Sequence, residues 1–330
     1  MSYAAAQAMV MKSPSAVAIP RPSVSVVVPV YNGEQTLEAL VDRLHPVLDK
    51  VASDYEVILV NDGSRDKSWE KTCELARTRP WVHGINLMRN YGQHNALLCG
   101  IKAARHSVVV TIDDDLQNPP EEIAMLLDKL ADGYDVVYGT PQKEQHGLWR
   151  DTASQVTKLV LQNAMKAEIA RNISAFRAFR TQVRDAFTSY QSPFVSIDVL
   201  LTWGTTRFAA IPVRHDPRQL GTSNYTFRKL VRHAVSMMTG FSTLPLQLAS
   251  LIGFAFTLLG ILILLYVIGR YLIAGGSVPG FPFLASIIAI FAGAQMFALG
   301  IIGEYLARMY FRMLERPAYT VRERVAHDND

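Results

Sequence analysis

The chain has only two cysteines, Cys73 and Cys99, in 330 residues. They form no metal-ligand spacing, and so few cysteines fit a reducing compartment, which argues against a disulfide-rich secreted domain. A large basic excess is missing too, because 33 Lys and Arg against 29 Asp and Glu leave a net charge of +4. That charge is too small to indicate nucleic-acid binding, but it suits an anionic membrane surface or phosphorylated ligands.

Charge is absent from two long stretches near the C-terminus. Residues 241–269 and 272–303 contain no charged side chain, and Arg270 is the only charge between them. Each stretch exceeds the roughly 20 residues that cross the hydrocarbon core of a bilayer. We therefore expect two transmembrane helices, at about 246–269 and 282–303, within a membrane segment over 246–308. A buried hairpin in a soluble protein is the alternative, but apolar residues occupy every helical face.

The flanks of these stretches predict the topology. Basic residues stand outside the pair, before it at Arg228, Lys229 and Arg232 and after it at Arg308, Arg312 and Arg316. By the positive-inside rule both termini and the segment before the first span are cytoplasmic, and residues 274–280 form a short external loop. Residues 309–330 are then a cytoplasmic tail.

Two further segments have a recognisable composition. Residues 1–22 lack the basic start and continuous apolar core of a signal peptide, which predicts a disordered N-terminal lead. Residues 225–245 interleave apolar side chains with basic ones, which suits an amphipathic helix at the membrane interface. A plain basic flank of the first span is the alternative.

Between these segments, residues 23–224 have the pattern of an α/β domain. Apolar, β-branched runs alternate with amphipathic stretches, which implies a mostly parallel sheet covered by helices on both faces. The expected strands are 24–29, 55–60, 83–87, 108–112 and 136–138, and the expected helices are 34–50, 66–78, 92–105 and 120–132.

Three consecutive acids, Asp113, Asp114 and Asp115, end the fourth expected strand. In open α/β sheets the carboxyl ends of strands bind ligands. Carboxylates this close repel one another unless a cation lies among them, and oxygen ligands favour Mg²⁺ or Mn²⁺, which bridge a protein carboxylate and a substrate diphosphate. The alternative is an acidic turn that caps the helix beginning at Pro120.

Polar loops follow the first three strands at the same predicted edge. Tyr31 follows the first strand, and Asp62 follows the second, where its carboxylate can accept a hydrogen bond from a nucleobase N–H. The third loop precedes a helix, so its amides and Arg89 are candidates for anion binding. Each loop alone is weak evidence, but the three beside the acidic triplet predict a nucleotide site.

The motifs at 29–32, 62–64, 89–94 and 113–121 together resemble family 2 glycosyltransferases of the GT-A fold. Further likeness at 176–177, 216–225, 241–246 and 303–306 extends over about 23–322. Within the family, the chain resembles the bacterial polyprenyl-phosphate glycosyltransferases, the group that includes dolichol-phosphate mannose synthase and the undecaprenyl-phosphate aminoarabinose and glucose transferases.

The resemblance implies roles for particular residues. Asp115 and Gln117, with Asp113, would hold Mg²⁺ or Mn²⁺, and Asp115, Arg177 and Arg218 would be catalytic. The nucleotide-sugar would contact Pro29, Tyr31, Asn32, Glu34, Asp62, Arg89, Gln93, Asp113 and Asp114. The lipid phosphate would contact Arg177, Arg218, Ser223, Asn224 and Tyr225.

The chain departs from the usual pattern of the group at three positions. Gly33 stands where Glu is usual, with Glu34 one place later, and Asn61 replaces an Asp. Asn224 replaces a Lys, which leaves neutralisation of a phosphate to Arg218 and to Arg214 or Arg228.

The resemblance implies an inverting transferase of the bacterial inner membrane that acts on a nucleotide-sugar, specifically a UDP-sugar. The acceptor would be undecaprenyl phosphate, the product would serve cell-envelope glycan modification, and the enzyme would be a homotetramer. One alternative is transfer to a sugar hydroxyl or polysaccharide, with Asp198 as the general base that such an acceptor needs. Another is a non-catalytic membrane protein that binds a nucleotide-sugar or a lipid.

Overall fold

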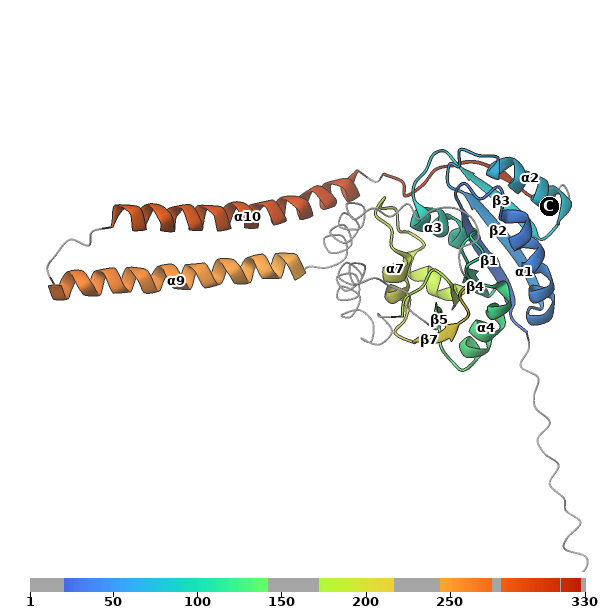
Figure 1. Cartoon of the computed structure of the whole chain (residues 1–330), viewed down its shortest axis with the longest axis horizontal. Helices are drawn as coiled ribbons and strands as arrows, with labels where there is room; N and C mark the ends of the chain where they lie inside the picture. Colours follow the sequence, from blue (N-terminus) through green and yellow to red (C-terminus); the bar gives the residue numbers. More distant parts are fainter. Residues whose placement is uncertain (1–20, 142–171, 217–243, 275–279, 315, 328–330) are drawn as a thin grey trace, which may run out of the picture.

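The computed structural model describes residues 21–141, 172–216, 244–274, 280–314 and 316–327 (Figure 1). Some predictions fall outside these ranges: the lead over 1–20, nearly all of the interfacial segment, and most of the external loop. Four predicted lipid-phosphate residues also lie outside them, namely Arg218, Ser223, Asn224 and Tyr225. Their roles stay predictions.

The α/β domain contains one sheet of eight strands with helices between them. The strands are β1 (Ser23–Val30), β2 (Asp54–Asn61), β3 (Val82–Leu87), β4 (Val108–Thr111), β5 (Val136–Pro141), β6 (Arg177–Arg180), β7 (Phe208–Val213) and β8 (Val321–Val325). The helices are α1 (Leu37–Val51), α2 (Ser68–Thr78), α3 (Gln93–Ala103), α4 (Ile123–Ala131) and α7 (Ile197–Gly204), with 3₁₀ helices η1 (Pro120–Glu122) and η2 (Thr181–Phe187). Every strand and helix expected within residues 23–141 is present.

The strand order, β7-β5-β6-β4-β1-β2-β3-β8, explains where a ligand can bind. β1 pairs in parallel with β2 on one side and with β4 on the other. The chain thus proceeds outward from β1 in one direction and later returns to its opposite side. Ligands of open α/β sheets bind at such a switch point, outside the carboxyl ends of the strands.

The valine run of β1 is buried because helices cover both faces of the sheet. Successive side chains in a strand point to opposite faces, so Val26 and Val28 pack with α1 and α4 in one apolar cluster. Val27 packs with α3 and α7 in the other. Figure 1 shows α1 and α4 on one side of the sheet and α3 and α7 on the other. This two-layer burial fixes the position of the β1 carboxyl end.

The C-terminal segment, predicted only as a tail after the membrane helices, is part of the folded sheet. Residues Val321–Val325 form β8, which pairs antiparallel with β3 and completes the sheet. The Asn86 side-chain amide donates to Glu323 at 2.9 Å and accepts from the Asn61 amide at 2.8 Å. Sequence reasoning missed β8 because its short alternation contains three charged residues. β6 and β7 were missed too, since β6 begins and ends with arginine and β7 contains Pro212.

Two long helices, α9 (Leu244–Ala274) and α10 (Phe281–Met313), extend from the domain side by side (Figure 1). By length and composition, Pro245–Ile273 and Ile290–Ala307 can each cross a membrane, in agreement with the predicted spans. Their apolar side chains are not buried in the protein, and Ile273 for example is 88% exposed. This exposure contradicts the alternative of a buried hairpin and leaves an apolar surface of the kind that lipid covers.

We expect Glu323→Ala to destabilise the domain, because it removes the acceptor of the buried Asn86 amide. An unsatisfied buried donor costs about 1–3 kcal/mol, so the melting temperature of the detergent-solubilised protein should fall. Glu323→Gln is the matched control, since it keeps a carbonyl oxygen in the same place. A Glu323→Ala protein that melts like wild type would show that β8 does not depend on this hydrogen bond.

Candidate active site

A cavity of about 240 Å³ opens at the switch point between β1 and β4. It is lined by Pro29, Val30, Tyr31, Asp62, Asn90, Gly92, Gln93, Asp113, Asp114 and Asp115. The structure therefore brings the loops after β1, β2, β3 and β4 together, as the strand ends predicted. Of the predicted nucleotide-sugar residues, Asn32, Glu34 and Arg89 are the ones that do not line it.

The loop after β1 is attached to the loop after β2. Asn32 adopts a left-handed backbone conformation with φ of 55°, which Asn tolerates better than most residues. Its amide donates to the Ser64 hydroxyl at 3.0 Å, and its side-chain oxygen accepts from the Arg65 amide at 2.9 Å. Asn32 thus holds Tyr31 at the cavity rather than lining it.

Asp62 orients the loop that precedes α3. Its two carboxylate oxygens accept hydrogen bonds from the amides of Tyr91 at 2.7 Å and Gly92 at 2.8 Å. Burial nevertheless raises the pKa of Asp62 to about 6. Gly63 permits this close approach of the two loops, because it has φ of +65° and its Cβ would lie 2.6 Å from the Asn90 nitrogen. Each oxygen keeps a lone pair for a donor in the cavity.

The acidic triplet is held at the opposite wall. Asp113 accepts from the Gln93 side chain at 2.7 Å, and Asp114 accepts from the Tyr31 amide at 3.3 Å. Burial, and then repulsion from Asp113 and Asp115, raise the pKa of Asp114 to about 7. Such a shift means that the protein holds these carboxylates together at an energetic cost that a bound cation would offset.

The donor atoms of this wall fit a hard divalent cation. No group of three or more His, Cys, Asp or Glu side chains in the described part of the chain can hold a metal ion by itself. A cation that carries a diphosphate needs only one or two protein carboxylates, because phosphate and water oxygens complete its coordination. Asp113 and Asp115 line the cavity and supply such oxygens. Gln117, the third predicted ligand, does not line it.

Two other predicted contact residues face elsewhere. The Glu34 carboxylate accepts from the Lys67 amide at 3.2 Å, beside the start of α2. Arg89 stacks on the Tyr91 ring, with 4.5 Å between the guanidinium carbon and the ring centroid, and lines a different cavity. Nucleotide binding by either residue stays a prediction.

Arg177, predicted to be catalytic, and Asp198, the general base of the alternative reaction, form a buried ion pair. Arg177, on β6, is 1% exposed, and its guanidinium pairs with the Asp198 carboxylate of α7. The Tyr138 hydroxyl donates to the same carboxylate at 3.1 Å. Neither charged residue lines the carboxylate cavity. Together with Tyr138, the pair joins the neighbouring strands β5 and β6 to α7.

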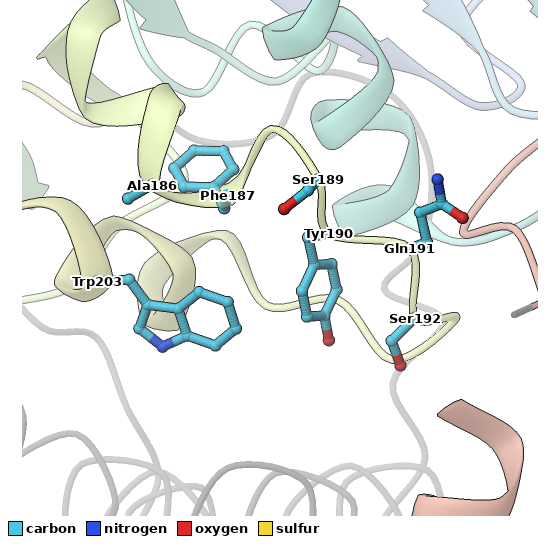
Figure 2. Close-up of a pocket in the computed structure, with 7 residues that line it drawn as sticks. All are labelled: Ala186, Phe187, Ser189, Tyr190, Gln191, Ser192 and Trp203. Carbon is cyan, nitrogen blue, oxygen red and sulfur yellow. The ribbon is translucent and has the colours of Figure 1, made fainter. Parts of the chain in front are cut away.

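A larger cavity of about 560 Å³ lies beside η2 and α7 (Figure 2). It is lined by Ala186, Phe187, Ser189, Tyr190, Gln191, Ser192 and Trp203. The Tyr190 and Trp203 rings pack edge to face with 5.5 Å between centroids. None of these described residues carries a charge, so this cavity lacks the groups that bind a diphosphate.

Sequence reasoning missed two elements of the carboxylate cavity. Asn90 and Gly92 line it, although only the amides of their loop and Arg89 had been considered. The glycine before α3 is the sequence feature that could have indicated them. Gly92 has φ of +95°, and its carbonyl accepts from the Asn95 and Ala96 amides at the start of α3.

We expect Gly33→Ala to disturb the acidic wall, because a Cβ at Gly33 would clash with an Asp114 carboxylate oxygen. Overpacking of this kind costs about 1–3 kcal/mol and should lower the melting temperature. The matched test repeats Gly33→Ala in an Asp114→Ala background, where the clash is gone and the cost should shrink. Equal costs in both backgrounds would show that the contact is unimportant.

We expect Asp198→Asn to lower thermal stability severely, since it leaves the buried Arg177 without a counter-charge. Breaking a buried pair in this way costs about 3–5 kcal/mol. The double variant Arg177→Met with Asp198→Leu removes both charges and should be more stable than Asp198→Asn. The opposite order of melting temperatures would contradict the structural role.

The chain is similar to known proteins over most of its length. The model of the family "Glycosyl transferase family 2" matches residues 25–187. An undecaprenyl-phosphate 4-deoxy-4-formamido-L-arabinose transferase of Pectobacterium carotovorum is 36% identical over 308 residues, which cover 92% of this chain and 94% of that protein. The transferase of the same name from Photorhabdus laumondii is 35% identical over 310 residues, covering 93% and 95%.

A solved structure of glucosyl-3-phosphoglycerate synthase from Mycobacterium tuberculosis, in complex with Mn²⁺, UDP-glucose and phosphoglyceric acid, is also similar. It is 18% identical, has a TM-score of 0.48, and the match covers 66% of this chain and 78% of that one. The relatives that align over nearly the whole length, with the mostly parallel sheet and its acidic switch point, show that this chain is a glycosyltransferase and belongs to glycosyl transferase family 2.

Proposed function

We propose that the protein transfers a sugar from a nucleotide-sugar, specifically a UDP-sugar, to a polyprenyl phosphate at the membrane surface. The observation that carries the proposal is the carboxylate cavity at the β1/β4 switch point of a chain attached to two membrane-length helices. The relatives named as undecaprenyl-phosphate sugar transferases align over both parts. An undecaprenyl phosphate acceptor would therefore suit this chain as well.

The cavity supports a nucleotide-sugar as the donor. Asp62 lies at one wall with a free lone pair on each carboxylate oxygen, and the N3–H of uracil is a suitable hydrogen-bond donor. The acidic wall at Asp113, Asp114 and Asp115 lies across the same cavity. A nucleobase would thus be held by a hydrogen bond to Asp62, and a diphosphate by a cation at the triplet.

Asp113 and Asp115 would hold Mg²⁺ or Mn²⁺ together with the donor diphosphate. When bound, the cation supplies electrostatic stabilisation of the negative charge that develops on the departing diphosphate. Gln93 orients Asp113 by a hydrogen bond of 2.7 Å, and the Tyr31 amide holds Asp114 behind it. These residues therefore position the donor rather than exchange protons.

The reaction is a single displacement at the anomeric carbon. An oxygen of the lipid phosphate forms the new bond, and the bond to the nucleoside diphosphate breaks, so the diphosphate leaves with the electron pair. A phosphate monoester is largely ionised at neutral pH, since its second pKa is near 6, and its attack needs no general base. This agrees with the burial of Asp198 in an ion pair, and the sugar configuration should invert.

The arrangement of the chain supports one topology. The segments before α9 and after α10 both belong to the same sheet, because β8 pairs with β3. A hairpin of two spans returns the chain to the side from which it left, and the basic flanks assign that side to the cytoplasm. The catalytic domain and the C-terminus would both be cytoplasmic, at the inner membrane of a bacterium. A homotetramer remains our expectation for the assembly.

The test of this function is sugar transfer from a panel of nucleotide-sugars to polyprenyl phosphate, followed by mass spectrometry of the lipid product. We expect chelation to abolish transfer and added Mg²⁺ or Mn²⁺ to restore it. Asp115→Asn should lower the rate at least about 100-fold, which corresponds to about 2.7 kcal/mol of barrier.

Asp128→Asn is the control for Asp115→Asn, because Asp128 is an exposed acid of α4 outside the cavity. It should transfer at the wild-type rate. Full turnover in excess chelator would disprove the metal requirement, and the absence of any lipid-linked sugar with every donor would disprove the acceptor.

A further inference from the structure

A second polar cavity, of about 260 Å³, lies next to the carboxylate cavity and on the side where the chain returns from α10. It is lined by Arg89, Asn90, Tyr91, Asn95, Pro193, Phe194, Arg316, Pro317 and Ala318. Asn90 lines both cavities, so the two are neighbours across one residue. No role has so far been given to this second cavity, which we call the arginine cavity.

The two neighbouring cavities have opposite charge. Four aspartates, and no Lys or Arg of the described residues, line the carboxylate cavity. Two arginines, Arg89 and Arg316, and no acid are among the described residues that line the arginine cavity. A lone phosphate would be repelled by the first and attracted by the second, because guanidinium groups bind phosphate oxygens through paired N–H donors.

The arginine cavity is also partly pre-organised. The Tyr91 ring lies under the Arg89 guanidinium, which limits the positions that this side chain can take. Asn95 is 8% exposed and donates its amide hydrogens to the carbonyl oxygens of Tyr91 and Pro193. Its own side-chain oxygen has no hydrogen-bond partner among the described residues. Buried polar atoms are rarely left so, and a bound hydrated or hydroxyl-bearing group would satisfy it.

The surroundings of the cavity suit an anion that is attached to an apolar chain. Arg316 follows Met313, the last residue of α10, by three positions, which spans at most about 10 Å of extended chain. Met313 is 79% exposed, so the uncovered apolar surface of α10 continues almost to the cavity. Phe194 and Pro193 add apolar lining on the opposite side.

We propose that the arginine cavity, through Arg89 and Arg316, holds the phosphate of the polyprenyl acceptor beside the donor site. The proposal rests on the function proposed above. The charge of a phosphate monoester at neutral pH, about −1.5 to −2, is matched by the two guanidinium groups. Asn90 then separates the attacking phosphate from the donor in the carboxylate cavity. Arg316 makes the post-membrane segment part of the acceptor site.

The experiment measures transfer by the full-length protein in a neutral detergent, with a short-chain polyprenyl phosphate as the varied acceptor. Arg316→Gln and Arg89→Gln should each raise the KM for the acceptor about tenfold or more, because a hydrogen bond to a charged group contributes about 1.5–3 kcal/mol. The affinity of Arg316→Gln for the nucleotide-sugar, measured by calorimetry on the same samples, should stay within about twofold of wild type. Arg316→Lys should recover part of the loss, since it keeps the charge.

Arg324→Gln is the matched control, because Arg324 is an exposed arginine of the same post-membrane segment that does not line the cavity. It should leave both constants unchanged. If wild type transfers sugar to the lipid while Arg316→Gln and Arg89→Gln keep the wild-type KM for it, the proposed cavity is wrong and the proposed function stands. If wild type itself makes no lipid-linked sugar, the function fails first.

Anionic headgroups of the bilayer are a second possible source of the same phosphate chemistry. Mixed micelles with and without phosphatidylglycerol separate the two sources. A defect of Arg316→Gln that persists in uncharged micelles supports a site for the acceptor phosphate. A defect that appears only with phosphatidylglycerol would overturn the proposal, because the arginines would then attract the membrane surface.

Discussion

The burial of carboxylates at the ends of β2 and β4 is the constraint on which the rest of the site depends. Four aspartates line one small cavity, and burial raises the pKa of Asp62 to about 6 and that of Asp114 to about 7. Backbone amides of Tyr31, Tyr91 and Gly92 hold these groups in place. Buried carboxylates of this kind are stabilised by a cation, which is why the proposed function pairs the cavity with a divalent ion and a diphosphate.

The membrane helices are connected to this site through the sheet. The chain leaves the domain into α9, returns along α10, and ends as β8 on the edge of β3. On the way it passes the loop at Arg89 and Tyr91, whose Asn90 also lines the carboxylate cavity. Because β8 covers an edge of β3 that would otherwise be open, the segment after α10 stabilises the sheet.

Prediction from sequence succeeded where chemistry is local. The strand runs, the acidic triplet and the two apolar stretches each follow from neighbouring residues, and all were placed correctly. It failed where a residue's partner lies far along the chain. Glu34 contacts Lys67, Arg177 of β6 pairs with Asp198 of α7, and Asn86 bonds to Glu323, which is 237 positions away. No periodicity in a single sequence reports such pairs.

The sequence by itself determined the α/β domain, the edge at which its polar loops gather, and two helices of membrane length, because these depend on burial patterns and on the carboxyl ends of parallel strands. Only the tertiary structure decided that Asp198 is committed to an ion pair. Only the tertiary structure, likewise, brought Arg316 beside Arg89 and so placed opposite charges in adjacent cavities. Those outcomes depend on contacts between segments that are distant in the sequence and that meet only in the folded domain.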